Sequence, residues 1–264
     1  MRRRLLRGFA ASVLAFAVVL PSTARPAQAA DGVAGNLLNV VFALGRLMAG
    51  NGSSGDIETL IGIAIGAVTE SRDEVLVYID AHQAAEVKAA ALSASNEFAD
   101  FEQIIDDELG LELWARDVGR AATLGKERMP IVGRPAAEQI AQALHQLYQL
   151  ARVGAEFAGL NNYLTNLTRD YIAASNSMLE KLEPDCAWIH TQTMPGGYQR
   201  SYRCVAANGV DDVIKTEQYL WGTYHLGPVD TEAVKLEAGK NSAWIVAREY
   251  LPILEQELRE MEEG

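Results

Sequence analysis

The sequence is poor in the residues and motifs on which enzymes commonly depend. Its 264 residues include four His and two Cys, and they lack the G-x-S-x-G, H-E-x-x-H, Walker and G-x-G-x-x-G patterns. Those patterns place a nucleophile, a zinc ion, a nucleotide phosphate and a dinucleotide, respectively. We therefore predict no catalytic residue, no cofactor and no metal ion. A hydrolase with an unrecognised site stays open as a third alternative for the function.

Proline and glycine are also sparse, with 8 and 22 residues, which is too few for a long disordered linker. Hydrophobic residues make up 49% of the chain, so disorder of the whole chain is excluded. No internal repeat is visible. We expect one large folded domain or two small ones.

The first 30 residues have the three-part layout of a secretory signal peptide. Four arginines within 2–7 give a basic start, an apolar run to Leu20 follows, and Arg25 to Ala30 supplies small residues for cleavage. The apolar run is shorter than the ~20 residues of a membrane span. We predict that 1–30 is a cleaved signal peptide and that the mature protein is secreted, by Sec or twin-arginine export.

Negative charge dominates the rest of the chain. Residues 1–30 contain five Arg and no acidic residue, so the remainder has 18 basic and 35 acidic side chains and a net charge of −17. Such a surface repels nucleic-acid backbones and anionic lipids. We expect no nucleic-acid partner, and contact with a membrane is not favoured.

Apolar residues recur at helical spacing over most of the chain, so the predicted fold is mostly all-α, an antiparallel bundle of long helices. A helical segment, 31–125, and a second one, 135–264, are separated by a joint that contains proline and glycine. From 157 to 178 the apolar spacing alternates between three and four residues, which is typical of bundle seams. We expect 135–182 to form one long helix or two nearly collinear helices.

One short β-hairpin, 186–206, interrupts the second helical segment. β-Forming residues flank the turn signal Met194–Gly197. Cys186 and Cys204 lie at its base, and because export is expected we predict a disulfide between them. With the two cysteines directly opposite, paired residue numbers sum to 390, which requires an odd-length loop.

This register would place several side chains on the disulfide's face of the hairpin, because strand residues alternate between faces. Trp188 would lie opposite Tyr202, and His190 opposite Arg200. Aromatic rings beside a cation suit stacking on sugar rings or binding a protein. The candidate recognition face therefore comprises Trp188, His190, Tyr198, Arg200 and Tyr202. The competing interpretation, which the sequence narrowly favours, is a structural cap that covers the helices.

A second feature is an apolar helical hairpin over 33–68, in which Gly62 and Gly66 form a G-x-x-x-G pattern that permits close helix approach. Helical pore-forming proteins keep a comparable hairpin buried until it meets a membrane. Charged residues interrupt both apolar segments, and each is shorter than a straight span. We therefore favour a buried core hairpin over a membrane-active one.

Together these features predict an acidic, secreted, non-catalytic helical protein. It would act by binding a protein or glycan partner at or outside the cell envelope. The alternative is a membrane-active, pore-forming-like helical protein that uses the hairpin 33–68.

Overall fold

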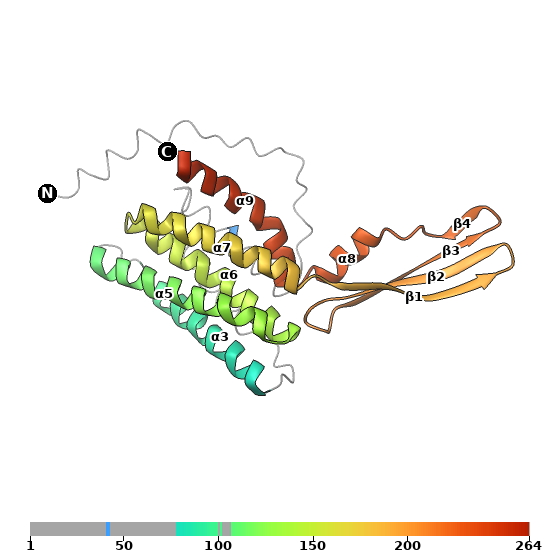
Figure 1. Ribbon diagram of the computed structural model, residues 1–264, viewed down its shortest axis with the longest axis horizontal. Coiled ribbons are helices and arrows are strands. Elements are labelled where there is room, and N and C mark those ends of the chain that lie inside the picture. The colour runs from blue at the N-terminus through green and yellow to red at the C-terminus, as the bar shows by residue number, and fades with distance from the viewer. Residues whose placement is uncertain (1–40, 43–77, 100, 102–106, 264) are drawn as a thin grey trace.

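The computed structural model describes residues 41–42, 78–99, 101 and 107–263. Over these residues the protein is mostly helical, with a four-stranded antiparallel sheet and a Cys186–Cys204 disulfide. In chain order the elements are α3 (Tyr78–Ala99), α5 (Glu108–Arg128), η3 (Met129–Ile131), α6 (Arg134–Phe157), α7 (Asn161–Lys181), β1 (Asp185–Met194), β2 (Gly197–Val205), β3 (Asp212–Leu220), β4 (Thr223–Leu226), α8 (Thr231–Gly239) and α9 (Ala243–Glu263). Helices α3, α5, α6, α7 and α9 lie together in what we call the helical body, and the sheet projects from one end of it (Figure 1).

Helix α3 buries a stripe of apolar side chains at the spacing seen in the sequence. Val87, Ala91, Ala94 and Phe98 are buried and lie three or four residues apart, so they share one helix face. That face packs against α5 and α6. Burial of this apolar area is the main stabilising term that holds α3 in the helical body.

Helix α5 begins where an acidic side chain can cap it. Asp107 accepts a hydrogen bond from the Gly110 N–H over 3.1 Å, which satisfies a free amide of the first turn. Trp114 stacks on Phe98 of α3, with 6.0 Å between the ring centroids. Helix α5 thus agrees with the mostly helical fold that the sequence predicts.

Helix α6 is the centre of the helical body and contacts α3, α5, α7 and α9. Pro135 lies in its first turn, where the missing N–H of proline is not needed. Its buried residues include polar ones, among them Glu138, His145 and Arg152. These side chains need partners inside the body, because buried polar groups without hydrogen bonds are costly.

The single long helix expected over 135–182 is wrong, and so is the nearly collinear pair, because the chain reverses after α6. Gly159 has φ = +67°, a left-handed conformation that favours glycine. The Leu160 N–H donates to the Ala155 carbonyl over 2.9 Å, in the pattern of a Schellman motif. The apolar spacing continues through Gly159, so periodicity alone did not reveal the reversal.

Helix α7 therefore runs back along α6. The Tyr148 hydroxyl donates to Asp170 over 2.7 Å, and Arg152 Nε donates to Thr168 over 3.1 Å. The apolar seam expected on α7 is buried from Leu164 to Met178. Its other side packs on α9, which runs through Pro252 as one helix.

The hairpin predicted over 186–206 is only half of the sheet. The strands are ordered β1-β2-β3-β4, each antiparallel to the next, so 185–226 forms a four-stranded meander. Asn208-Gly209 between β2 and β3 is a turn signal that could have extended the prediction. The charges of Lys215 and Glu217 interrupt the pattern of β3, so it was not recognised as a strand.

The predicted register of β1 and β2 is correct at the base of the sheet and wrong beyond Trp188. Trp188 lies opposite Tyr202, as expected, but the next pair is His190 with Ser201. His190 is therefore not opposite Arg200. The cause is a β-bulge at the intervening residue of β1, which adds one residue to that strand.

The same bulge overturns the predicted loop length. Met194 pairs with Gly197 around a two-residue turn, whereas an unbulged ladder required an odd-length loop. Gly196 has φ = +85°, and this left-handed conformation is what glycine allows at a tight turn after proline. The turn signal was thus correct, and only the assumption of a regular ladder failed.

The sheet makes little contact with the helical body. Its strands contact one another and α8, and the other described helices make at most marginal contacts with it. The β1–β2 and β3–β4 turns lie together at the end far from the helices (Figure 1). We call this end the tip, and we call the disulfide end the base.

Two of the sequence interpretations concern segments that the structure does not describe. The signal peptide 1–30 lies wholly outside the described residues, and so does the apolar hairpin 33–68 apart from Val41 and Phe42. Among the described helices, none combines the length and hydropathy that a membrane span requires.

The buried seam of α7 generates a prediction about stability. Leu164 is 5% exposed, so Leu164→Asp should bury a charge without a partner. We expect the free energy of unfolding to fall by several kcal/mol, roughly 3 or more, in urea denaturation. Asn162→Asp, at an exposed position of the same helix, is the control and should leave it nearly unchanged. Equal stability of the two variants would mean that the seam is not part of the core.

Candidate functional site on the sheet

The structure brings four of the five predicted recognition residues together. Trp188, Tyr198, Arg200 and Tyr202 share one face of the sheet, which we call face A. His190 lies on the opposite face, because the bulge pairs it with Ser201. Thr191 and Thr193 lie opposite Arg200 and Tyr198 on face A instead.

Arg200 is the centre of face A. Its guanidinium carbon lies 3.9 Å from the ring centroid of Trp188 and 5.1 Å from that of Tyr198. Both distances are within the range of cation–π attraction. Its Nε donates to Glu217 of β3 over 2.6 Å, so the cation is neutralised by an acid from the neighbouring strand.

Glu217 is the buried partner of this arrangement. Its side chain is 2% exposed, and it also accepts hydrogen bonds from the Val229 N–H over 2.9 Å and the Tyr198 hydroxyl over 3.4 Å. Burial would raise the pKa of Glu217, but the bonds from Val229 and Arg200 outweigh it, so the pKa is lowered. Glu217 is therefore a carboxylate that fixes the sheet, not a free acid.

Aromatic rings continue across face A toward β4. Tyr198 stacks on Tyr219 with 5.8 Å between centroids, and Tyr219 meets Tyr224 edge-on at 5.0 Å. Hydrogen bonding with Tyr224 raises the pKa of Tyr198 to about 12, so its hydroxyl keeps its proton at neutral pH. Three phenol groups from three strands thus present hydroxyls beside an aromatic surface.

Helix α8 covers only the base of face A. Its Val234 and Ala238 pack on Cys204, with Tyr202 and Val213 at the edge of this small core. Trp188 and Tyr224, further along the strands, are 36% and 40% exposed. At its base face A therefore packs on α8, whereas its outer part is not covered by any described helix.

Sequence reasoning missed the most exposed large hydrophobic residue of the sheet. Trp221, at the β3–β4 turn, is 77% exposed and has φ = +52°. Trp221-Gly222 follows the β-forming residues Tyr219 and Leu220, and this was the available signal. It was missed because β3 itself was not recognised.

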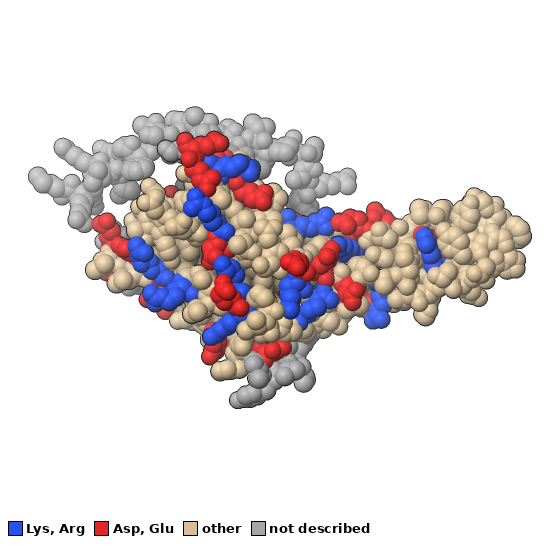
Figure 2. All heavy atoms as spheres, viewed as in Figure 1, with Lys and Arg blue, Asp and Glu red and all other residues tan. Residues whose placement is uncertain are grey.

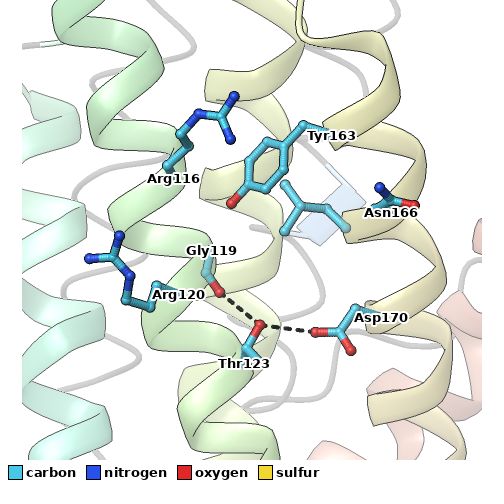
Figure 3. A pocket seen from close by; sticks show the side chains of 8 residues that line it. Arg116, Gly119, Arg120, Thr123, Tyr163, Asn166 and Asp170 are labelled. Carbon is cyan, nitrogen blue, oxygen red and sulfur yellow. Dashed lines mark hydrogen bonds between the residues drawn. The ribbon is translucent and has the colours of Figure 1, made fainter.

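An open groove lies between α5 and α7, lined by Arg116, Gly119, Arg120, Thr123, Tyr163, Asn166, Leu167 and Asp170 (Figure 3). Its charged groups already have partners: Arg116 pairs with Glu112, Arg120 with Asp117, and Asp170 with Lys126. A groove whose charges are satisfied internally has no free group with which to select a ligand. We do not assign a function to it.

Titratable groups are also buried between α6, α7 and α9. His145 Nδ1 lies 2.7 Å from the Tyr171 hydroxyl, and Glu138 accepts a hydrogen bond of 2.6 Å from the Ala243 N–H. Burial raises the pKa of Glu138 to about 7 and lowers the pKa of His145 to about 4. Both side chains are fully enclosed, so we interpret them as connections between helices.

The described residues contain no group of three or more His, Cys, Asp or Glu side chains that could hold a metal ion. Comparison of the chain with family models, curated proteins and solved structures gives no match.

Glu138 and His145 generate a prediction about pH. Folding raises the pKa of Glu138 above its ordinary value of 4.5, so its contribution to stability is full below pH 4.5 and is lost toward pH 7. Folding lowers the pKa of His145 below 6.5, so its contribution is full above pH 6.5 and is lost toward pH 4. In the wild type the two contributions therefore change the free energy of unfolding in opposite directions as pH rises from 4.5 to 6.5.

Single substitutions should separate the two pH dependences. As pH rises from 4.5 to 7, we expect His145→Gln to lose stability more steeply than the wild type. As pH falls from 6.5 to 4, we expect Glu138→Gln to lose stability more steeply than the wild type. Each full change is on the order of 2–3 kcal/mol, measured by urea denaturation at each pH. Parallel pH profiles of the two variants would contradict this assignment.

The disulfide generates a further prediction. Cys186 and Cys204 close a loop with a sequence separation of 18, so replacing both by Ala should lower the free energy of unfolding by up to ~3 kcal/mol. Wild-type protein measured in reductant is the control and should behave like the variant. Two free thiols in the protein purified without reductant, detected by mass spectrometry, would contradict the disulfide.

Proposed function

We propose that this chain is a secreted, non-catalytic binding protein that acts at or outside the cell envelope. The helices, which we take to form an antiparallel bundle, hold the sheet outward. The outer part of face A and the tip are the binding surface. The helical body would support the sheet, and the acidic surface of the body would keep the protein soluble.

One observation carries this proposal: the outer part of the sheet stands clear of the helices and still exposes aromatic rings. Trp188, Trp221 and Tyr224 are 36%, 77% and 40% exposed. Protein-binding and ligand-binding surfaces are enriched in Trp and Tyr, because these rings offer a large contact area at a low entropy cost. Without a partner, the exposed parts of these rings add nothing to the stability of the fold.

The proposed location outside the cytosol is supported by the disulfide, since such bonds persist in oxidising compartments. It also rests on the predicted signal peptide 1–30. The membrane-active alternative uses 33–68, outside the described residues, and nothing in the described structure favours it. Dye release from liposomes by the mature protein, lost in Gly62→Asp, would support that alternative.

The proposal predicts which surface residues matter for binding. We expect the double variant Trp188→Ala, Tyr224→Ala to lose tenfold or more of its capture of cell-envelope fractions in a pull-down. Its melting temperature should change little, because both side chains are partly exposed.

A matched control is available on the helical body. Ile131 is 72% exposed and belongs to η3, so Ile131→Ala removes a comparable exposed apolar side chain that is not part of the sheet. We expect this variant to bind as the wild type does. Undiminished capture by the double variant, or equal loss by Ile131→Ala, would refute the assignment of binding to the sheet.

A further inference from the structure

Trp221 occupies a backbone conformation that a bulky residue rarely adopts. It lies between Leu220 and Thr223, which pair across the β3–β4 turn, and its φ is +52° while that of Gly222 is +86°. Turns with two left-handed residues favour Asn, Asp or Gly at both positions. A tryptophan here is strained, and residues that remain strained are concentrated at functional sites.

The indole of Trp221 is also held in place. A Cβ added at Gly196 would lie only 2.6–2.8 Å from the ring atoms Cδ2, Cε2 and Cε3 of Trp221, so the ring lies directly over this glycine. The Trp221 N–H donates to the Gly196 carbonyl over 2.9 Å. The indole ring thus packs on the β1–β2 turn, which covers one face of it.

The remaining surface of the indole faces solvent. Trp221 is 77% exposed although the β1–β2 turn covers part of its ring. Of the four tryptophans in the sequence, it alone has an indole that is mostly exposed to solvent. Trp114 and Trp244 are buried, and Trp188 lies against Arg200. A flat aromatic surface with a fixed orientation is therefore presented at the tip.

The surroundings of this ring carry no charged side chain of Asp, Glu, Lys or Arg. Residues 188–199 and 218–226 contain no Asp, Glu, Lys or Arg, in a chain of net charge −12. Figure 2 shows the outer part of the sheet almost free of charged groups, while acidic and basic groups are spread over the helical body. Thr191, Gln192, Thr193 and Thr223 are exposed at this end and offer hydroxyl and amide groups.

We propose that Trp221 is the stacking platform of a binding site for a neutral glycan. The C–H bonds on one face of a sugar ring carry partial positive charge and are attracted to the negative face of an aromatic ring. The hydroxyls of the sugar would bind the uncharged polar groups around the indole. This inference rests on the proposed function and names the class of ligand at that surface.

The same observations argue against other ligands. An anionic ligand finds no cation at the tip, since Arg200 is already paired with Glu217. A membrane surface is a poorer fit, because a single acyl chain gives only marginal membrane binding and one indole offers less apolar area. The rest of the tip consists of turn residues with exposed backbone groups, which hydrocarbon cannot satisfy.

The experiment starts from the capture of envelope material by the mature protein. One portion of the material is digested with proteinase K, one is extracted with chloroform and methanol, and one is deglycosylated with trifluoromethanesulfonic acid. We expect capture to survive the first two treatments and to be lost after the third. Loss after proteinase K or solvent extraction would overturn the proposal in favour of a protein or a lipid, respectively.

Salt distinguishes a neutral glycan from a charged one. Interactions between charges weaken as salt shortens the Debye length from about 10 Å at 0.1 M to about 3 Å at 1 M. We expect capture at these two salt concentrations to agree within twofold. A tenfold or greater fall at high salt would overturn the assignment of a neutral ligand.

Substitutions at Trp221 separate binding from stability. Trp221→Asn gives the Asn-Gly pair that this turn favours, so its melting temperature should equal or exceed that of the wild type. Its capture should still fall tenfold or more. Trp221→Tyr keeps an aromatic face and should retain part of the capture. Full capture by Trp221→Asn would overturn the role of the indole.

Failure of this inference is distinguishable from failure of the proposed function. If capture is lost in Trp188→Ala, Tyr224→Ala but persists after deglycosylation, the sheet binds and the ligand class is wrong. If the wild type captures nothing from untreated envelope material, both the proposed function and the glycan site are refuted.

Discussion

The carboxylate of Glu217 connects the parts on which the sheet depends. It is buried on β3 and accepts hydrogen bonds from Arg200 on β2 and from the Val229 N–H, just before α8. A buried charge that loses its partners is strongly destabilising, so these bonds hold strand β2, strand β3 and the start of α8 in one arrangement. Arg200 is thereby fixed over Trp188. Face A is thus ordered from inside the sheet, with at most marginal contacts from the described helices of the helical body.

The helical body uses the same principle in its core. Arg152 is fully buried on α6 and reaches Thr168 on α7 and Glu257 on α9. These bonds are satisfied together only in one relative position of the three helices, whereas apolar contacts tolerate many positions. The helical body is therefore a defined support from which the sheet projects. The described helices of the body share few contacts with the sheet, so neither part distorts the other.

The sequence predicted those features that depend on local chemistry. The mostly helical content, the turn at Met194–Gly197 and the Cys186–Cys204 pair follow from apolar spacing, turn residues and the cysteine count. The reversal at Gly159 and the bulge beyond Trp188 did not, because the apolar pattern continues through the first and the second leaves no local signal. The bulge also decided the site, since one extra residue moves His190 to the other face.

Trp221, which was missed because β3 was not recognised, is more instructive. Local propensity argues against tryptophan at a left-handed turn position, and burial argues against leaving its ring in solvent. In a sequence that otherwise agrees with its fold, a residue that breaks two local rules at one position is expected where function opposes stability. The base of the sheet follows the rules, with a disulfide and a small apolar core. The tip does not, and this asymmetry between the two ends is what the proposed binding site at the tip rests on.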